Sequence, residues 1–157
     1  MYETKPIVLF LCSANTARSQ IAEALLRHHA GDRLTAISAG LAPGEVVHPL
    51  ALRVLEEKGI GTTDLRPKHV REFLGRVHAA TVITVCSRAA EACPTLWPGP
   101  VEMEHWAIDD PAAVDGSEEE RLDAFRAARD TLEPMLLEWL KLSWLGQTVS
   151  TRIGRQS

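Results

Sequence analysis

The stretch IVLFLCSANTARSQIAEALL, residues 7–26, changes character after its first five residues. Ile7–Leu11 is an uninterrupted run of apolar strand-forming residues, which predicts a strand buried on both faces. Cys12 follows at once, and the next residues are small or polar up to Arg18. Apolar residues then recur at helical spacing over Ser19–His29. The stretch therefore predicts a buried strand, a loop that begins with a thiol, and a helix.

The rest of the chain repeats this alternation of apolar strands and amphipathic helices. We expect strands at Leu34–Ser38, Ala80–Val85 and Pro100–Glu104, helices at Pro49–Lys58 and Pro67–Leu74, and short helical turns at Arg88–Cys93. Such alternation predicts an α/β fold with a parallel sheet flanked by helices on both faces. Ligands of these folds bind beyond the carboxyl ends of the strands, and both Cys12 and Cys86 directly follow a predicted strand.

The last predicted helix begins after Ser117, which can form a capping box with Glu120. Its apolar residues share one face: Leu122, Phe125, Leu132, Leu136, Trp139 and Leu140. Pro134 interrupts this pattern, and because proline in a helix interior costs about 3 kcal/mol, we expect a kink or two helices. Residues 1–145 are predicted to form a single domain, followed by a disordered tail over residues 146–157.

Composition narrows the function classes. The net charge of −4 argues against a nucleic-acid-binding protein, which is usually basic. No apolar run approaches the roughly 18 residues that span a bilayer, so we expect a cytoplasmic protein that does not enter membranes, and a monomer. The three cysteines form no Cys-x-x-Cys pair, and there is no nucleotide-binding glycine motif, so we expect no metal and no bound cofactor. Reactivity is the remaining reason for thiols so placed.

The loop after the first strand has the residue types of an oxyanion site. Backbone N–H groups at a helix N-terminus attract anions, and an arginine adds a forked pair of donors. The predicted oxyanion-binding residues are Ser13, Ala14, Asn15, Thr16, Ala17, Arg18 and Ser19. The same field favours a thiolate at Cys12. The alternative is that Cys12 is a small buried side chain at a strand end and Arg18 a surface cation.

The chain resembles the low-molecular-weight protein tyrosine phosphatase fold, and within it the thioredoxin-coupled arsenate reductases. The resemblance depends on VLFLCSANTARSQIAEALL, SAG, VITVCSRAAEACP and EHWAIDDPA. It implies a four-stranded parallel sheet in the order 2-1-3-4. It also implies arsenate as the substrate, with phosphate or sulfate as competing anions, and thioredoxin as the electron donor and protein partner.

The other two cysteines distinguish the branches of this family, because a phosphatase needs neither. In the implied strand order, Cys12 and Cys86 follow neighbouring strands, about 4.8 Å apart. Cys93 stands seven residues after Cys86, roughly 10.5 Å along a helix, so a disulfide between these two needs the segment to unwind. The resulting hypothesis is a relay from Cys12 to Cys86 to Cys93. In the alternative, Cys86 is a core residue and Cys93 has no role.

Asp110, which precedes Pro111, matches the general acid of the family; the alternative is a solvated acidic loop. Some relatives carry an additional cysteine where this chain has Ala17. Some also bind a monovalent cation with residues matched by Asn15 and Ser38, but Lys68 and its neighbour Arg66 argue against a potassium site here. We therefore predict an arsenate reductase, with a phosphatase acting through a phosphocysteine and a non-catalytic oxyanion-binding thiol switch as alternatives.

Overall fold

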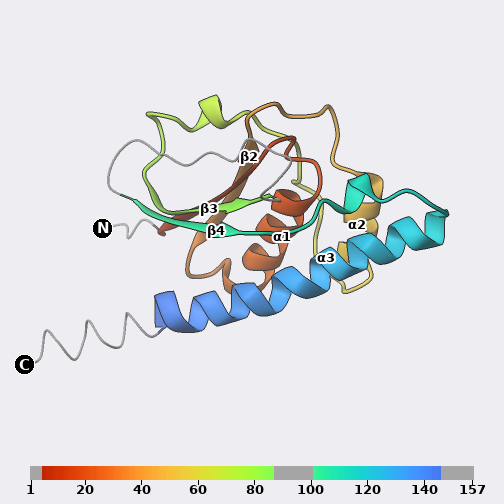
Figure 1. Cartoon of the computed structure of the whole chain (residues 1–157). Coiled ribbons are helices and arrows are strands. Elements are labelled where there is room, and N and C mark those ends of the chain that lie inside the picture. The colour runs from red at the N-terminus through yellow and green to blue at the C-terminus, as the bar shows by residue number, and fades with distance from the viewer. Residues whose placement is uncertain (1–4, 87–100, 146–157) are drawn as a thin grey trace, which may run out of the picture.

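This computed structural model of the chain describes residues 5–86 and 101–145. Its centre is a four-stranded parallel sheet in the order β2-β1-β3-β4 (Figure 1). The strands are β1 Ile7–Cys12, β2 Thr35–Gly40, β3 Ala79–Val85 and β4 Glu102–Trp106. Both the parallel arrangement and the predicted order are confirmed. In the register, Leu11 pairs with Ala39 and with Thr84, so the carboxyl ends of the three strands lie at one edge.

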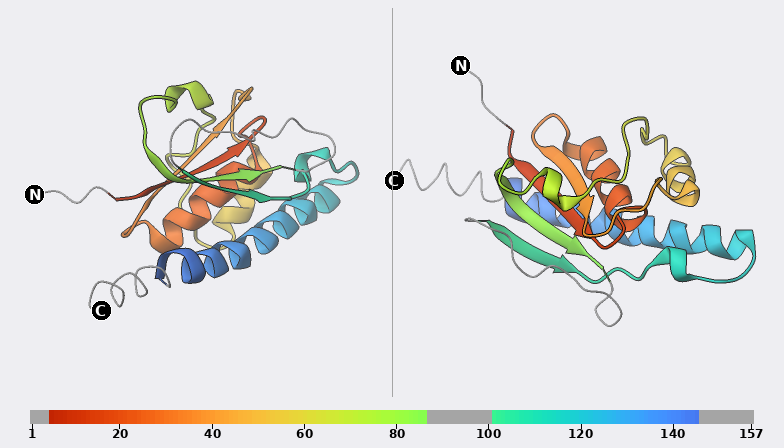
Figure 2. Two further views of the ribbon diagram at one scale, coloured as in Figure 1. Left: turned by 60° about the vertical axis from the view of Figure 1, so that its left-hand side comes forward. Right: turned by 90° about the horizontal axis from the view of Figure 1, so that it is seen from above.

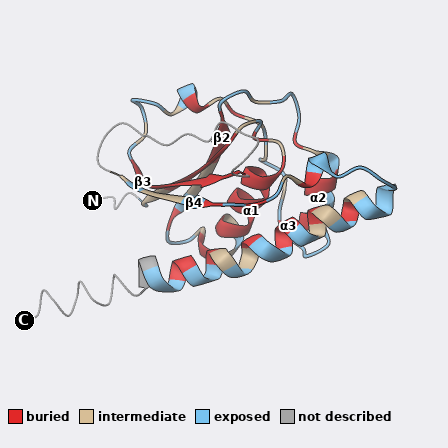
Figure 3. Ribbon diagram, viewed as in Figure 1, coloured by how far each residue is buried: buried red, intermediate tan, exposed pale blue. Residues whose placement is uncertain are grey.

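Three α-helices pack together on one face of the sheet (Figure 2). They are α1 Arg18–Ala30, α2 Pro49–Glu56 and α3 Glu118–Trp139. Their buried faces meet the strand side chains of Val8, Phe10 and Ile83 in the larger apolar cluster. All six apolar residues predicted for the inner face of α3 are buried. The core therefore lies between the sheet and these helices, as the distribution of buried residues also shows (Figure 3).

A smaller apolar cluster covers the opposite face of the sheet. It contains Leu9, Leu11 and Val82, which alternate along their strands with the residues of the larger cluster. Val70 closes it from the short 3₁₀ helix η1 Val70–Glu72. Within residues 5–86 and 101–145, η1 is the helical turn that lies on this face.

Of the two outcomes expected at Pro134, a kink or two helices, the division into two helices is wrong. Helix α3 runs unbroken from Glu118 to Trp139 and continues as π-helical turns over Leu140–Leu145. Pro134 is exposed, so water can satisfy the backbone carbonyl group that loses its helical partner. Burial of Leu132 and Leu136 on the opposite side holds the helix against the sheet. The cost of one proline is therefore smaller than that of ending the helix.

Two other predicted elements differ from the structure. The helix expected at Pro67–Leu74 is reduced to the three residues of η1, which His69 caps through its side chain. The last strand lies two residues later than expected, because β4 is an edge strand and tolerates polar residues that do not resemble a buried strand. A 3₁₀ turn at Pro111–Ala113, η2, was not predicted. The turns expected at Arg88–Cys93 and the tail expected at residues 146–157 lie outside the described residues.

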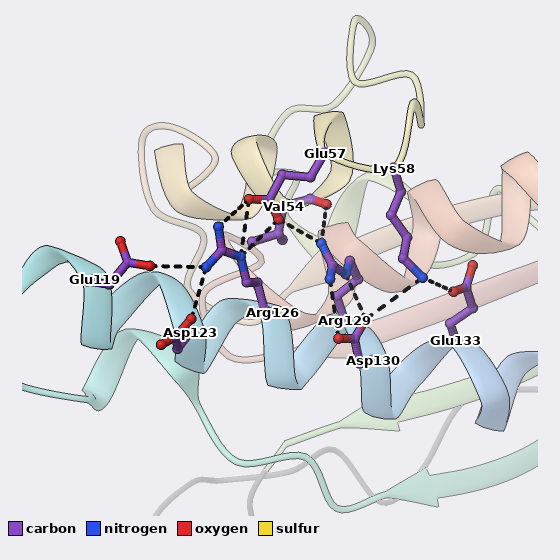
Figure 4. Close-up of polar contacts among 9 residues, drawn as sticks. All are labelled: Val54, Glu57, Lys58, Glu119, Asp123, Arg126, Arg129, Asp130 and Glu133. Carbon is purple, nitrogen blue, oxygen red and sulfur yellow. Dashed lines mark hydrogen bonds and ion pairs between the residues drawn. The ribbon is translucent and has the colours of Figure 1, made fainter.

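An ion-pair cluster connects the end of α2 to α3 (Figure 4). Arg126 Nη2 lies 2.6 Å from Glu57 Oε2, and Arg129 Nη1 donates to Glu57 Oε1 at 2.9 Å. Arg129 Nη1 also donates to the carbonyl oxygen of Val54 at 2.9 Å. These ion pairs, called the clamp below, hold the C-terminal end of α2 against α3. The N-terminal end of α2 begins beside the loop that follows β1.

No helix in the described part of the chain is long and apolar enough to cross a membrane.

Candidate active site

The loop between β1 and α1 turns its backbone carbonyl groups toward the segment after β2. The carbonyl oxygens of Cys12, Ser13, Ala14 and Thr16 accept hydrogen bonds from the backbone N–H groups of Leu41, Ala42, Gly44 and His48, at 2.9 to 3.3 Å. In a trans peptide the N–H group points away from the C=O group. The amides of residues 13, 14, 15 and 17 are therefore turned away from residues 41–48. This is the arrangement that an anion cradle needs.

Two hydrogen-bonding groups lie against the sulfur atom of Cys12. The backbone N–H of Asn15 donates to Cys12 Sγ at 3.1 Å, and Ser19 Oγ lies 2.8 Å from the same atom. Cys12 is a free thiol and is only 3% exposed. Hydrogen-bond donors held against a sulfur atom stabilise its anion more than its protonated form, and this loop places two hydrogen-bonding groups there.

Asn15 occupies the tightest position of the loop. Its φ is +52°, in the left-handed region that asparagine tolerates better than most residues. Its side chain Nδ2 donates to Ser19 Oγ at 2.7 Å. Gly40 packs against this turn, since a Cβ atom there would stand 2.7 Å from the carbonyl oxygen of Ser13. The glycine at the end of β2 thus lets the loop approach the sheet closely.

Arg18, the first residue of α1, connects the loop to the segment after β4. Its Nη1 donates to the carbonyl oxygen of Ile108 at 2.8 Å, and its Nη2 lies 3.9 Å from Asp110 Oδ2. The carboxylate of Asp110 accepts from the backbone N–H of Ala112 at 2.9 Å and so caps η2. The structure thus gathers a thiol, a buried guanidinium and a partly exposed carboxyl group at one edge of the sheet.

A buried ion pair lies behind the loop. Lys68 Nζ stands 3.4 Å from Glu23 Oε1, and both side chains are less than a tenth exposed. Glu23 Oε1 also accepts from Ser38 Oγ at 2.8 Å, while Lys68 Nζ donates to the carbonyl oxygen of Arg66 at 2.7 Å. Burial lowers the pKa of Lys68, and the Glu23 carboxylate opposes this shift in part. The amino group of Lys68 therefore faces the Glu23 carboxylate, at the same oxygen that accepts from Ser38.

His48 joins the loop to α2. Its backbone N–H donates to the carbonyl oxygen of Thr16 at 2.9 Å, and its Nδ1 accepts from the backbone N–H of Leu50 at 3.1 Å. The ring stacks on Phe125 of α3, with 4.5 Å between ring centroids. Burial, and then the charge of Arg121, lowers the pKa of His48, which favours the neutral ring that the cap requires.

The predicted site residues are brought together in large part. The seven predicted oxyanion-binding residues form the loop and the start of α1, and Asp110 lies 3.9 Å from one of them, Arg18. Cys86 follows β3, the neighbour of β1, and is buried. It is disulfide-bonded. Cys93 lies outside the described residues.

Four residues around the loop were missed by the sequence analysis or given no role: Gln20, Glu23, His48 and Lys68. One signal in the sequence is the run of polar residues Arg18–Gln20 at the start of a helix. The structure buries all three, although residues of these types are usually exposed. Their partners lie far along the chain, so the sequence does not pair them. Among residues 5–86 and 101–145, no three or more His, Cys, Asp and Glu side chains are grouped to hold a metal ion.

Comparison with known proteins gives consistent matches to this architecture. An arsenate reductase of Shouchella clausii is 37% identical over 129 residues, which cover 82% of this chain and 91% of that protein. A solved arsenate reductase in a phosphate-binding state superposes with a TM-score of 0.72 at 25% identity, covering 87% of this chain and 97% of that one. A thioredoxin-dependent arsenate reductase of Corynebacterium glutamicum is 30% identical with a TM-score of 0.58, covering 87% of this chain and 64% of that one.

The family described as low molecular weight phosphotyrosine protein phosphatase matches residues 7–151, which include the sheet, the loop after β1 and the three α-helices. The match extends over far more than half of the chain, and the geometry of the loop agrees with it. The chain belongs to the low-molecular-weight phosphotyrosine protein phosphatase family.

Proposed function

We propose that this protein reduces arsenate to arsenite through a thiol/disulfide relay of Cys12, Cys86 and Cys93, and that thioredoxin recycles it. The observation that carries the proposal is the loop around Cys12, where the sulfur atom lies among hydrogen-bonding groups at 2.8 and 3.1 Å. The named activity of the similar proteins from Shouchella clausii and Corynebacterium glutamicum supports arsenate over other tetrahedral anions.

The first step is attack by the Cys12 thiolate on the arsenic atom. A bond forms between sulfur and arsenic while one arsenate oxygen leaves as water. The loop amides and the Arg18 guanidinium neutralise the charge on the remaining oxygens. Asp110 lies 3.9 Å from Arg18 Nη2, within the site, and donates the proton that the leaving oxygen requires.

The second step transfers two electrons to arsenic. The Cys86 thiolate attacks the Cys12 sulfur, the sulfur–arsenic bond breaks, and its electron pair stays with arsenic, which leaves as arsenite. A Cys12–Cys86 disulfide remains. Its location is supported by the neighbouring positions of β1 and β3, whose ends carry the two thiols.

The third step releases Cys12. The Cys93 thiolate attacks the Cys86 sulfur, which frees Cys12 and leaves a disulfide that the thioredoxin dithiol reduces. A disulfide at Cys86 beside a free Cys12, as found here, agrees with the state at the end of this relay. The cycle needs reduced thiols at its start, and a reducing compartment such as the cytosol maintains them.

The test compares wild type with single cysteine variants, each reduced and desalted beforehand. With thioredoxin, its reductase and NADPH, wild type should consume NADPH continuously when arsenate is added. Cys93→Ser should release about one equivalent of arsenite and then stop, because it retains the Cys12–Cys86 disulfide. Intact-mass measurement without reductant detects that bond.

The control is Cys86→Ser, which should release no arsenite although Cys12 still binds the anion. Hydrolysis of an aryl phosphate is followed in parallel, since a phosphatase needs Cys12 but neither of the other thiols. Undiminished multiple turnover by Cys93→Ser would remove that residue from the relay. Aryl-phosphate hydrolysis without any arsenate turnover in wild type would favour the phosphatase alternative instead.

A further inference from the structure

Gln20 is a fully buried polar residue of α1, and it directly follows Ser19. Its side-chain Nε2 lies 2.9 Å from the carbonyl oxygen of Asn15 and 3.0 Å from Asn15 Oδ1. The same nitrogen lies 2.8 Å from the carbonyl oxygen of Arg66. All three partner atoms are oxygens that accept hydrogen bonds, so the group that faces them is the NH₂ of the Gln20 amide.

The orientation of the Asn15 side chain is fixed by donors. The backbone N–H of Lys68 donates to Asn15 Oδ1 at 2.8 Å, and a backbone N–H can only donate. Gln20 adds a second donor to the same oxygen. The Asn15 amide therefore turns its Nδ2 toward Ser19 Oγ, where it donates at 2.7 Å.

This orientation decides the direction of the next hydrogen bond. Ser19 Oγ accepts from Asn15, so its own hydrogen is available for Cys12 Sγ at 2.8 Å. The sulfur then receives one hydrogen bond from Ser19 and one from the Asn15 backbone N–H. Both favour the thiolate over the thiol.

We propose that Gln20 is a positioning residue that holds Asn15 in its left-handed conformation and keeps the donor chain directed toward the Cys12 sulfur. It acts from behind the loop, through Asn15 and Ser19. This inference rests on the proposed function only in that Cys12 is the attacking thiolate.

The other end of the Gln20 amide supports a role beyond stability. Gln20 Oε1 is buried and accepts no hydrogen bond from any residue that the structure describes. An unpaired buried oxygen weakens a fold. The side chain thus satisfies its donor end, which faces the loop, while its acceptor end remains unpaired.

The test uses Gln20→Met, which keeps the length of the side chain and removes its donors. Iodoacetamide labelling of Cys12 is followed by peptide mass spectrometry across a range of pH, without arsenate. We expect the labelling rate at pH 7 to fall roughly threefold to tenfold, the range for one ordinary hydrogen bond. The pH–rate profile should move to higher pH, and arsenate turnover should recover in parallel as the pH rises.

Stability separates this role from a structural one. Gln20→Met removes one unpaired buried oxygen, Oε1, and leaves another, the Asn15 carbonyl oxygen, so the free energy of unfolding should change little. The control is Leu132→Ala on α3, which should destabilise the protein and leave the labelling profile unchanged. A labelling profile of Gln20→Met that superposes on the wild-type profile would overturn the proposal.

A second variant, Gln20→Glu, keeps the test decisive should Gln20→Met fail to fold. Its carboxylate would face the three oxygens that Gln20 now contacts. The charged form is repelled by these oxygens, so the free energy of unfolding of the variant, relative to wild type, should fall as the pH rises from 5 to 8. Its labelling profile should also move to higher pH. Equal stability at both pH values with an unchanged profile would contradict the proposal.

The two proposals fail in different ways. A shifted profile in Gln20→Met without arsenate turnover in wild type would remove the proposed function and retain the positioning role. Normal arsenate turnover in wild type with an unshifted profile would remove the positioning role alone.

Discussion

Lys68 and Glu23 are oppositely charged side chains that the fold buries next to each other, behind the loop of Cys12. Burying two charges costs free energy that their attraction offsets only when the pair is intact and hydrogen-bonded. Here Ser38 and the carbonyl oxygen of Arg66 complete the hydrogen bonds of the two groups. The backbone N–H of Lys68 also donates a hydrogen bond to the side chain of Asn15, so the ion pair is linked to the loop that follows β1.

We expect Lys68→Met to lower the free energy of unfolding by about 3 kcal/mol, because it leaves the Glu23 carboxylate buried without its nearest cation. The double variant Glu23→Gln/Lys68→Met should recover most of this loss, since no charge is then buried. Urea unfolding at neutral pH measures both effects. The control Lys141→Met removes an exposed lysine of the same type and should change stability by less than about 0.5 kcal/mol. Equal losses in the single and double variants would contradict a paired role.

Helix α2 connects the loop that follows β1 to the core through its N-cap residue. Its N-cap residue, His48, contacts the loop through its backbone, caps the helix through its ring and stacks on α3. Pro49 stands at the first helical position, where a backbone N–H group would have no partner within the helix. Proline has no such group, so it suits the start of a helix. The cap depends on a neutral Nδ1, so this element is sensitive to pH.

At pH 7, His48→Ala should destabilise the protein by about 1 kcal/mol, the usual effect of losing an N-cap. Because the pKa of His48 is lowered in the folded protein, the unfolded chain binds the proton more readily as the pH falls below about 6.5. Wild type should therefore lose stability over this range, and its advantage over His48→Ala should shrink.

Thermal unfolding between pH 5 and pH 8 measures the difference between wild type and His48→Ala. His48→Asn serves as the matched variant, because it retains a capping acceptor that does not titrate. A constant difference between wild type and His48→Ala across this range would show that the ring does not act as a pH-dependent cap.

At the scale of the whole molecule, the ion pairs of Glu57 with Arg126 and Arg129 connect the end of α2 to α3 (Figure 4). Hydrogen bonds from Arg126 hold the pKa of Glu57 down at about 2, and those from Arg129 act in the same direction. A carboxyl group with a lowered pKa contributes stability that is present above its ordinary range and is lost as the pH falls through the folded value.

We expect Glu57→Gln to be less stable than wild type at pH 6, with a difference that narrows as the pH falls from about 4.5 toward 2. Urea unfolding at pH 3 and pH 6 tests this. Amide hydrogen exchange in α2 should also become faster in the variant, since that helix loses its anchor on α3. Glu45→Gln, at an exposed position, is the control and should show neither effect. A difference that is the same at pH 3 and pH 6 would contradict the assigned cause.

The sequence by itself determined the parts of this protein that depend on local pattern. The apolar run of β1, the small residues after Cys12 and the inner face of α3 each carry a periodicity or residue type that only one structure satisfies well. The position of the loop followed from them, because a parallel sheet gathers the ends of its strands at one edge. Pro134 does not divide the last helix, because the cost of a proline depends on its exposure, which the local sequence does not give.

Only the tertiary structure decided which distant groups meet. The contact between Gln20 and Arg66, the ion pair of Glu23 with Lys68, and the clamp on Glu57 each join residues more than forty positions apart. No local pattern encodes such pairs, because a buried polar group takes its partner from whichever segment the fold brings to it. The sequence thus determined where the reactive thiol lies, and the packing of remote segments decided which hydrogen bonds reach it.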